Sequence, residues 1–296
     1  MNYTSVLMIA VDDLRTQLSV YPEGGASMHT PNIERLASQS VVFERAYVQV
    51  ALCMPSRTSL LTSRRPDTSR SWTIEHDQWF RLSGGANWTT LPGAFLEHGY
   101  LTLGMGKVFH ETEPPRDPQD CNVSWSPEAY HPDGGLARRG GLFDPPGDGA
   151  KLGGAGKLAH GFADEDEPRL QDGQTTAHAL ATIERMANGS YGADVANGSR
   201  PFFLAVGLHK PHVPWWVPSR FFDLYPLDAI APVPHPGLPT HAVAPAYKDW
   251  QVRSWCGSNA DIQPFCGPSG EAPMTAHFPL DNTSIPADGA AYMRQA

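Results

Sequence analysis

The residues most able to do chemistry begin at Cys53, a cysteine that Pro55 and then Arg57 follow closely. Proline favours the first turn of a helix, so we predict a helix over residues 55–63 whose unpaired N–H groups face an anion. Cys53 is then either a nucleophile at the head of that helix or a buried structural thiol, because free cysteine is usually buried. Arg57 is unfavourable for the helix dipole in the first turn, so a nearby anion or carboxylate explains it better.

Two adjacent carboxylates, Asp12 and Asp13, directly follow an apolar segment over residues 4–11 that we predict to be a buried strand. Mg²⁺ and Ca²⁺ prefer oxygen ligands, so this pair could hold a hard cation. Taken alone, the two residues are better explained as a solvated turn or a helix N-cap.

Two further groups of polar side chains follow predicted strands. They are Lys107 and His110, after a strand over residues 100–103, and His209 and Lys210, after a strand over residues 201–207. Each could be an ordinary solvent-facing or packed side chain. Ligands of open parallel sheets bind beyond the carboxyl ends of the strands, however. Four polar groups at such ends therefore favour a shared functional site.

Strands and helices alternate along the chain. A further strand is predicted over residues 40–47, and helices over residues 30–37, 90–99, 174–187 and 218–225. In the helix over 174–187, the apolar face is predicted to include Leu180, Ile183 and Met186. This order of elements predicts an α/β fold, with a doubly wound, mainly parallel sheet and helices on both faces.

The composition permits a sizeable core, because 41% of the 296 residues are hydrophobic. We predict a single domain over residues 1–296, with irregular excursions at about 111–170 and 227–290 where periodicity is weak. The formal net charge of −9 argues against a nucleic-acid or membrane-surface partner. An anionic substrate would need a local cationic pocket.

Cysteines and asparagines bear on the cellular compartment. Cys256 and Cys266 are close enough for a short-loop disulfide, and no Cys-x-x-Cys pair indicates a zinc–thiolate site. Glycosylation acceptor triplets begin at Asn2, Asn87, Asn122, Asn188, Asn197 and Asn282. Together they favour a secretory route, although no signal peptide is visible. The apolar segment at residues 6–11 is too short to span a membrane.

The segment from Cys53 to Arg57, followed by residues 58–64, resembles the signature of type I sulfatases of the alkaline phosphatase superfamily. Further blocks match one branch of that family, whose substrates are sulfated sugars of glycosaminoglycans. These blocks are residues 11–15, 64–68, 106–110 and 205–212. The similarity covers about residues 4–112 and 172–226.

The resemblance implies that Cys53 is oxidised to formylglycine by the formylglycine-generating enzyme in the endoplasmic reticulum. One hydroxyl of the hydrated aldehyde then attacks sulfur, and the second later expels sulfate. Asp12 and Asp13 would hold Ca²⁺ together with the group derived from Cys53. Arg57 would offset the negative charge gathered there.

The resemblance also implies roles for the basic side chains. Lys107 would contact the sulfate, and His110 would be the base that releases it. His209 would bind substrate and protonate or stabilise the leaving oxygen. Lys210 is adjacent and would be a weaker substrate contact. The implied location is lysosomal or extracellular.

In this family an Asp-His or Asn-His pair on a later strand, followed by a lysine, completes the metal site. No such segment precedes Ala296, so the resemblance is to the N-terminal part of a sulfatase. Two alternatives stay open: an inactive truncated sulfatase that serves as a binding or scaffold protein, and a phosphodiester or phosphonate hydrolase of the same superfamily.

Overall fold

The computed structural model describes most of the first 230 residues. The described residues are 4–21, 28–74, 79–110, 120, 123–126, 129–132, 160–162, 170–212 and 215–230. The chain divides into two compact units, one of residues 1–134 and 168–212 and the other of residues 135–167 and 213–296. All of the predicted site residues lie in the first unit. The predicted disulfide and most of the two irregular excursions lie outside the described residues.

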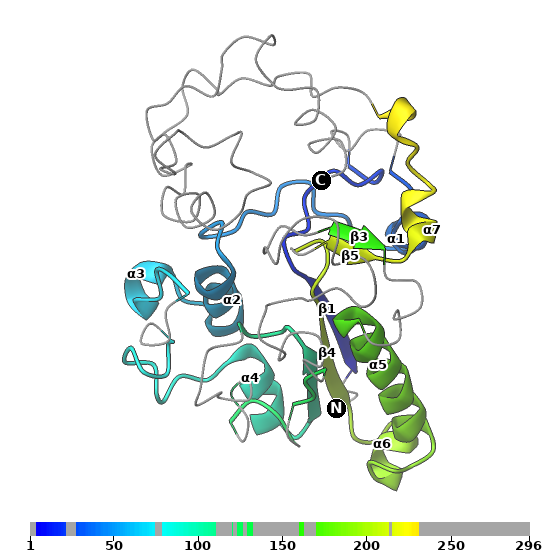
Figure 1. The fold of residues 1–296 in the computed structure, drawn as a ribbon. Helices are drawn as coiled ribbons and strands as arrows, with labels where there is room; N and C mark the ends of the chain where they lie inside the picture. The colour runs from blue at the N-terminus through cyan, green and yellow to red at the C-terminus, as the bar shows by residue number, and fades with distance from the viewer. Residues whose placement is uncertain are drawn as a thin grey trace. The chain divides into compact units, whose positions relative to one another are not determined.

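A parallel sheet of three strands forms the centre of the first unit (Figure 1). The strands are β1 (Val6–Val11), β2 (Leu101–Gly106) and β4 (Phe202–Leu208), in the order β1-β4-β2. Val11 pairs with Leu208 and Gly106 pairs with Gly207, so the three carboxyl ends lie level at one edge. The predicted parallel sheet is confirmed.

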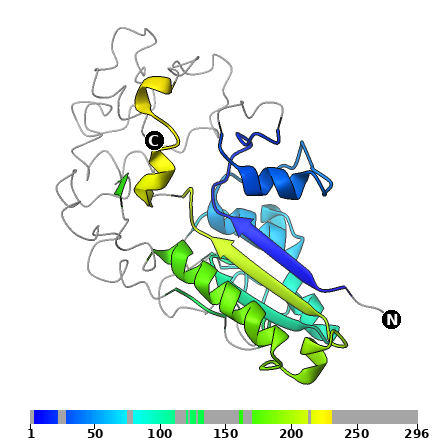
Figure 2. The same ribbon diagram turned by 90° about the vertical axis from the view of Figure 1, so that its right-hand side faces the viewer.

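Helices cover both faces of this sheet (Figure 2). On one face, Leu204 and Val206 of β4 pack in a core with Ala179 and Met186 of α5 (Gln171–Ala187). On the other face, the core contains side chains of β4, α2 (Cys53–Thr62) and the adjoining α4 (Leu91–Glu97): Phe203, Ala205, Met54, Leu61 and Phe95. Successive residues of a strand point to opposite faces, so the buried run of β4 serves both cores.

The remaining elements are short. In the first unit they are α1 (Pro31–Ala37), α3 (Pro66–Ser69) and α6 (Ala193–Ala196). In the second unit, β3 (His160–Phe162) pairs in parallel with β5 (Trp215–Val217), and α7 (Ser219–Phe222) and the 3₁₀ helix η4 (Leu227–Ala229) follow. None of the helices among the described residues is long and apolar enough to cross a membrane.

The strand predicted over residues 40–47 is wrong, because this segment is irregular and exposed. Val41 and Phe43 are 81% and 73% exposed. Their apolar, bulky side chains suit a strand, but a strand forms only where its backbone groups pair with a neighbour. Among the described residues, β1 pairs only with β4, so this segment adds nothing to the sheet.

The apolar face predicted for the helix over 174–187 is also wrong in part. The helix begins earlier, at Gln171, and its buried stripe consists of Thr175, Ala179, Thr182 and Met186. Leu180 and Ile183 are 58% and 43% exposed. Small side chains let α5 approach the sheet closely: a Cβ atom added to Gly106 would lie 2.8 Å from Cγ2 of Thr175.

Candidate active site

Asp12 and Asp13 follow β1 directly and have very different surroundings. The Asp12 backbone N–H donates to the carbonyl oxygen of Leu208 at 3.0 Å, which continues the pairing of β1 with β4. Asp13 has a positive φ of 59° and turns the chain away. Asp12 is only 3% exposed, whereas the Asp13 side chain is 56% exposed. A solvated turn therefore explains Asp13 but not Asp12.

The Asp12 carboxylate is held between two buried cations. Nη2 of Arg57 donates to Oδ1 at 2.8 Å, and Nζ of Lys107 donates to Oδ2. Burial raises the pKa of Asp12, but the charges and hydrogen bonds of Lys107 and Arg57 outweigh it and lower that pKa to about 2. The carboxylate is therefore ionised across the whole physiological pH range.

Arg57 joins three elements of the fold. It projects from α2, and its Nη1 donates to the carbonyl oxygens of Lys107 at 2.5 Å and Val108 at 2.8 Å, just past β2. Its other terminal nitrogen pairs with Asp12 at the end of β1. The guanidinium has several fixed donors, so it can bridge α2, β1 and β2 at once. We predicted that a nearby anion or carboxylate accounts for an arginine in the first turn of this helix, and Asp12 is that carboxylate.

Cys53 is the first residue of α2, which begins there and not at Pro55 as predicted. The side chain is half-buried, and its Sγ lies 3.9 Å from Nζ of Lys107. Burial raises the pKa of the Cys53 thiol; Asp12 and Asp13 raise it further, and Lys107 and Arg57 only partly oppose them. The thiolate is disfavoured here, which argues against an unmodified cysteine as the nucleophile.

Two glycines allow Lys107 to reach this position. The Lys107 backbone N–H donates to the carbonyl oxygen of Gly207 at 2.9 Å, where β2 and β4 end. A Cβ atom on Gly207 would lie 2.1 Å from the Lys107 carbonyl carbon and oxygen. Gly106 has a positive φ of 66°, which side-chain-bearing residues rarely adopt. His110 lies just beyond Val108 and is partly buried.

The turn after β4 carries His209 and Lys210. Both carboxylate oxygens of Asp172 accept backbone N–H groups from this turn, Oδ1 from His209 at 2.6 Å and Oδ2 from Lys210 at 2.8 Å. The His212 N–H donates to the carbonyl oxygen of His209 at 3.0 Å. Burial, opposed by Asp172, lowers the pKa of Lys210 to about 8.

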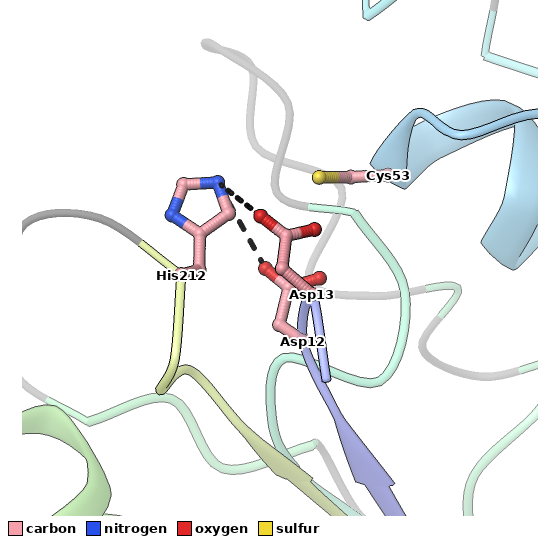
Figure 3. A group of neighbouring side chains, drawn as sticks. All are labelled: Asp12, Asp13, Cys53 and His212. Carbon is pink, nitrogen blue, oxygen red and sulfur yellow. Dashed lines mark ion pairs between the residues drawn. The ribbon is translucent and has the colours of Figure 1, made fainter. Parts of the chain in front are cut away.

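His212 and Asp172 were not among the predicted site residues. Nε2 of His212 lies 4.0 Å from Oδ2 of Asp12 and 3.9 Å from Oδ2 of Asp13. In Figure 3, the imidazole faces both carboxylates and the Cys53 sulfur points towards them from α2. A second histidine after a buried strand was the available signal for His212. No local pattern distinguishes Asp172 from other acids in the first turn of a helix.

Four side chains of the site could act as metal ligands, and two of them are the carboxylates that a hard cation prefers. One ligand atom from each of Asp12, Asp13, Cys53 and His212 lies within 4.8 Å of the others. The two carboxylates supply the oxygen ligands that Ca²⁺ prefers. Both oxygens of Asp12 are already paired with Arg57 and Lys107, so a cation would share this carboxylate with them.

Comparison with known proteins identifies the family of the chain. The sulfatase family model matches residues 4–228. Iduronate 2-sulfatases of mouse and human are each 39% identical over 246 residues, which cover 83% of this chain and 42% of the relative. A sulfatase of Formosa agariphila is 31% identical over 248 residues, covering 78% and 43%.

Solved structures support the same fold. A phosphonate monoester hydrolase of Agrobacterium radiobacter has a TM-score of 0.54 and 19% identity, covering 99% of this chain and 55% of that one. The chain spans less than half the length of the curated sulfatases it matches. The predicted family is confirmed and the chain is similar to iduronate 2-sulfatases, as predicted; the chain belongs to the sulfatase family.

Proposed function

We propose that this chain hydrolyses a sulfate ester at the site around Cys53. The observation that carries this proposal is the buried group of Asp12, Arg57 and Lys107 beside Cys53, in a chain of the sulfatase family. Two fixed cations next to a nucleophile suit an anionic ester, whose charge must be stabilised as the ester bond breaks.

Cys53 acts after oxidation to formylglycine by the formylglycine-generating enzyme. The raised pKa of its thiol supports this step, because an unmodified thiol here would be a poor nucleophile. Once hydrated, formylglycine supplies an oxygen nucleophile and a second hydroxyl for product release. Cys53 is the first residue of α2 and its Sγ lies within 4.8 Å of a ligand atom of each of Asp12, Asp13 and His212, so the modified side chain would stand beside both carboxylates.

The basic side chains bind the sulfate group and transfer protons. Lys107 binds the sulfate oxygens and shares its charge between Asp12 and the substrate. Arg57 offsets the negative charge gathered around Asp12. His209 donates a proton to the leaving oxygen, and His110 accepts a proton during sulfate release. Lys210, the next residue after His209, is a weaker substrate contact that adds positive charge, since at neutral pH a lysine with a pKa of about 8 is mostly protonated.

Asp12 and Asp13 would hold Ca²⁺, and the neighbouring His212 faces both carboxylates. Such a cation would supply Lewis-acid stabilisation of negative oxygens. Within the chain, Lys107 and Arg57 keep Asp12 ionised, and the hydrogen bond from Arg57 orients its carboxylate.

The substrate is a sulfated sugar or glycosaminoglycan, as the names of the iduronate 2-sulfatase relatives suggest. We place the protein on the secretory route, in lysosomes or outside the cell. The acceptor asparagines Asn87, Asn188 and Asn197 support this route because all three are exposed.

Parallel assays test the reaction class. The chain is produced with the formylglycine-generating enzyme and supplied with Ca²⁺, then offered an aryl sulfate, a sulfated uronic acid disaccharide and an aryl phosphodiester. We expect sulfate release from both sulfate esters, abolished in Cys53→Ala and retained in Leu60→Ala, whose side chain is exposed on the same helix. Preferential cleavage of the phosphodiester would show that the chain is a phosphodiester hydrolase of the same superfamily and not a sulfatase in activity. Stoichiometric ligand binding without turnover would indicate a scaffold protein.

A further inference from the structure

Asp172 makes a contact that its place in α5 does not require. An acidic residue in the first turn is favourable for the helix dipole wherever its side chain points. This carboxylate instead reaches the turn after β4 and accepts one N–H group with each oxygen, from His209 and Lys210. The contact spans 37 and 38 residues of sequence and connects a helix to the turn that carries two predicted site residues.

The contact fixes the backbone from which the basic side chains project. The N–H of His212 donates to the carbonyl oxygen of His209, which closes the same turn. Nζ of Lys210 also donates to the His212 carbonyl oxygen, at 3.2 Å. With both N–H groups of the His209–Lys210 pair held by one carboxylate, the turn has little freedom to rotate. That backbone sets the point from which the His209 imidazole projects and limits the rotamers it can adopt.

We propose that Asp172 is a positioning residue that holds the His209–His212 turn so that His209 can protonate the leaving oxygen. This inference rests on the proposed function, because the leaving-group role of His209 belongs to it. Asp172 acts through the backbone of the turn, to which both of its carboxylate oxygens are bonded.

The chemistry of the contact explains why a carboxylate is needed. Here each of the two N–H donors has its own acceptor atom, and a carboxylate provides both acceptors in one plane. An asparagine offers one acceptor, and its NH₂ group would face the second N–H donor. A glutamate keeps both acceptors on a longer stem. Charge-assisted hydrogen bonds of this kind are stronger than neutral ones, which suits their role of holding the His209–His212 turn in place.

The test compares Asp172→Asn and Asp172→Glu with Glu184→Gln, which removes an exposed carboxylate from the same helix. First, hydrogen exchange of the His209 and Lys210 amides is measured in each full-length chain. We expect exchange to be at least tenfold faster in Asp172→Asn, nearly unchanged in Glu184→Gln and intermediate in Asp172→Glu. This measurement needs no turnover, so it tests the contact even if the proposed function fails.

Second, kcat is compared between an aryl sulfate with a good leaving group and a sugar sulfate with a poor one. A poor leaving group needs a proton from His209 to depart, whereas a good one departs without it. Asp172→Asn should therefore lower kcat about 10–100-fold for the sugar sulfate and far less for the aryl sulfate. Asp172→Glu should restore part of the loss. Equal losses on both substrates, or unchanged amide exchange in Asp172→Asn, would overturn the positioning role. Absence of turnover in the unmutated chain would instead count against the proposed function.

Discussion

Asp12 is the residue on which the electrostatics of the site depend. It is buried, it bears a full charge, and two cations from different parts of the sequence converge on it. Removal of one partner from a buried ion pair strongly destabilises the fold, because the other charge is left buried and unpaired. Substitutions around Asp12 therefore affect both stability and chemistry, and experiments need to separate the two effects.

The pKa of Asp12 predicts a specific loss of stability in acid. Its folded-state pKa is about 2, below the ordinary value of 3.8, so the unfolded state binds the proton first as pH falls. The stabilisation is fully present above about pH 4 and is lost as pH falls towards 2, with a total on the order of 2 kcal/mol. Urea unfolding across this pH range should show the loss in the unmutated chain.

The control for this prediction is Asp67→Asn, which replaces an exposed carboxylate on α3 and should keep the full acid dependence. Asp12→Asn should show a smaller acid dependence together with lower stability at neutral pH. The assignment to Asp12 fails if Asp12→Asn and Asp67→Asn lose stability in parallel as pH falls.

Arg57 and lysine are not interchangeable at this position. The guanidinium donates to Asp12 and to two carbonyl oxygens at once, and a lysine cannot reproduce that fork. We expect Arg57→Lys to lower kcat on the order of 10²-fold for sulfate release. Arg185→Lys, an exposed change on α5, should leave kcat unchanged. Near-normal kcat in Arg57→Lys would mean that only the positive charge matters.

The site is assembled at the scale of elements, because three strand ends and one helix start supply it. The parallel register of β1, β4 and β2 brings Asp12, Lys107 and His209 to one edge of the sheet. α2 then presents Cys53 and Arg57 to that edge. Gly207 is a point where this assembly leaves no room for a side chain, since the Lys107 carbonyl group lies directly against it.

Gly207→Ala should destabilise the fold more than an ordinary glycine substitution. Its Cβ atom would overlap the Lys107 carbonyl group at 2.1 Å, and backbone atoms cannot move aside easily. We expect a loss of about 3 kcal/mol or more by urea unfolding, at the upper end for overpacking. Gly99→Ala has open space and only an unfavourable positive φ, so it should lose about 1 kcal/mol. Similar losses in the two variants would contradict the close approach of β2 and β4.

Local pattern predicted both β1 and β4 as buried strands, which is right for β4 and wrong for β1, where Leu7 and Ile9 are 53% and 55% exposed. β4 is a continuous apolar run between polar segments. α4 begins at Leu91, directly after the N-cap Thr90, whose side chain accepts the N–H of Gly93. The segment at residues 40–47 has the composition of a strand, but pairing depends on distant parts of the chain that composition does not reveal. The buried face of α5 was missed because its closeness to the sheet favours threonine and alanine over leucine.

Site residues were predictable to the extent that each followed a predicted strand or began a predicted helix. Asp12, Lys107 and His209 met that condition, and the structure brings Asp12 and Lys107 into contact around Cys53. Asp172 lies in a helix that begins earlier than predicted. Its partner N–H groups lie in the turn after β4, and only the packing of α5 against the sheet brings the two together.

At the scale of the whole molecule, the exposed acceptor asparagines predict glycosylation. Asn188 and Asn197 each accept the N–H of the serine two positions on, so both triplets lie in turns at the surface. Chains produced through the secretory route should lose mass on enzymatic deglycosylation, and Asn188→Gln and Asn197→Gln should each remove one glycan. An unaltered mass after deglycosylation would contradict the secretory assignment.

The central claim for the whole molecule is that Cys53 becomes the formylglycine of a sulfatase site. The most direct test is the mass of the Cys53 peptide, from the chain produced in cells that also process a reference sulfatase. We predict a peptide in which an aldehyde replaces the CH₂SH group, and no such peptide from Cys53→Ala. A fully unmodified thiol at Cys53, in cells that do convert the reference sulfatase, would contradict the claim.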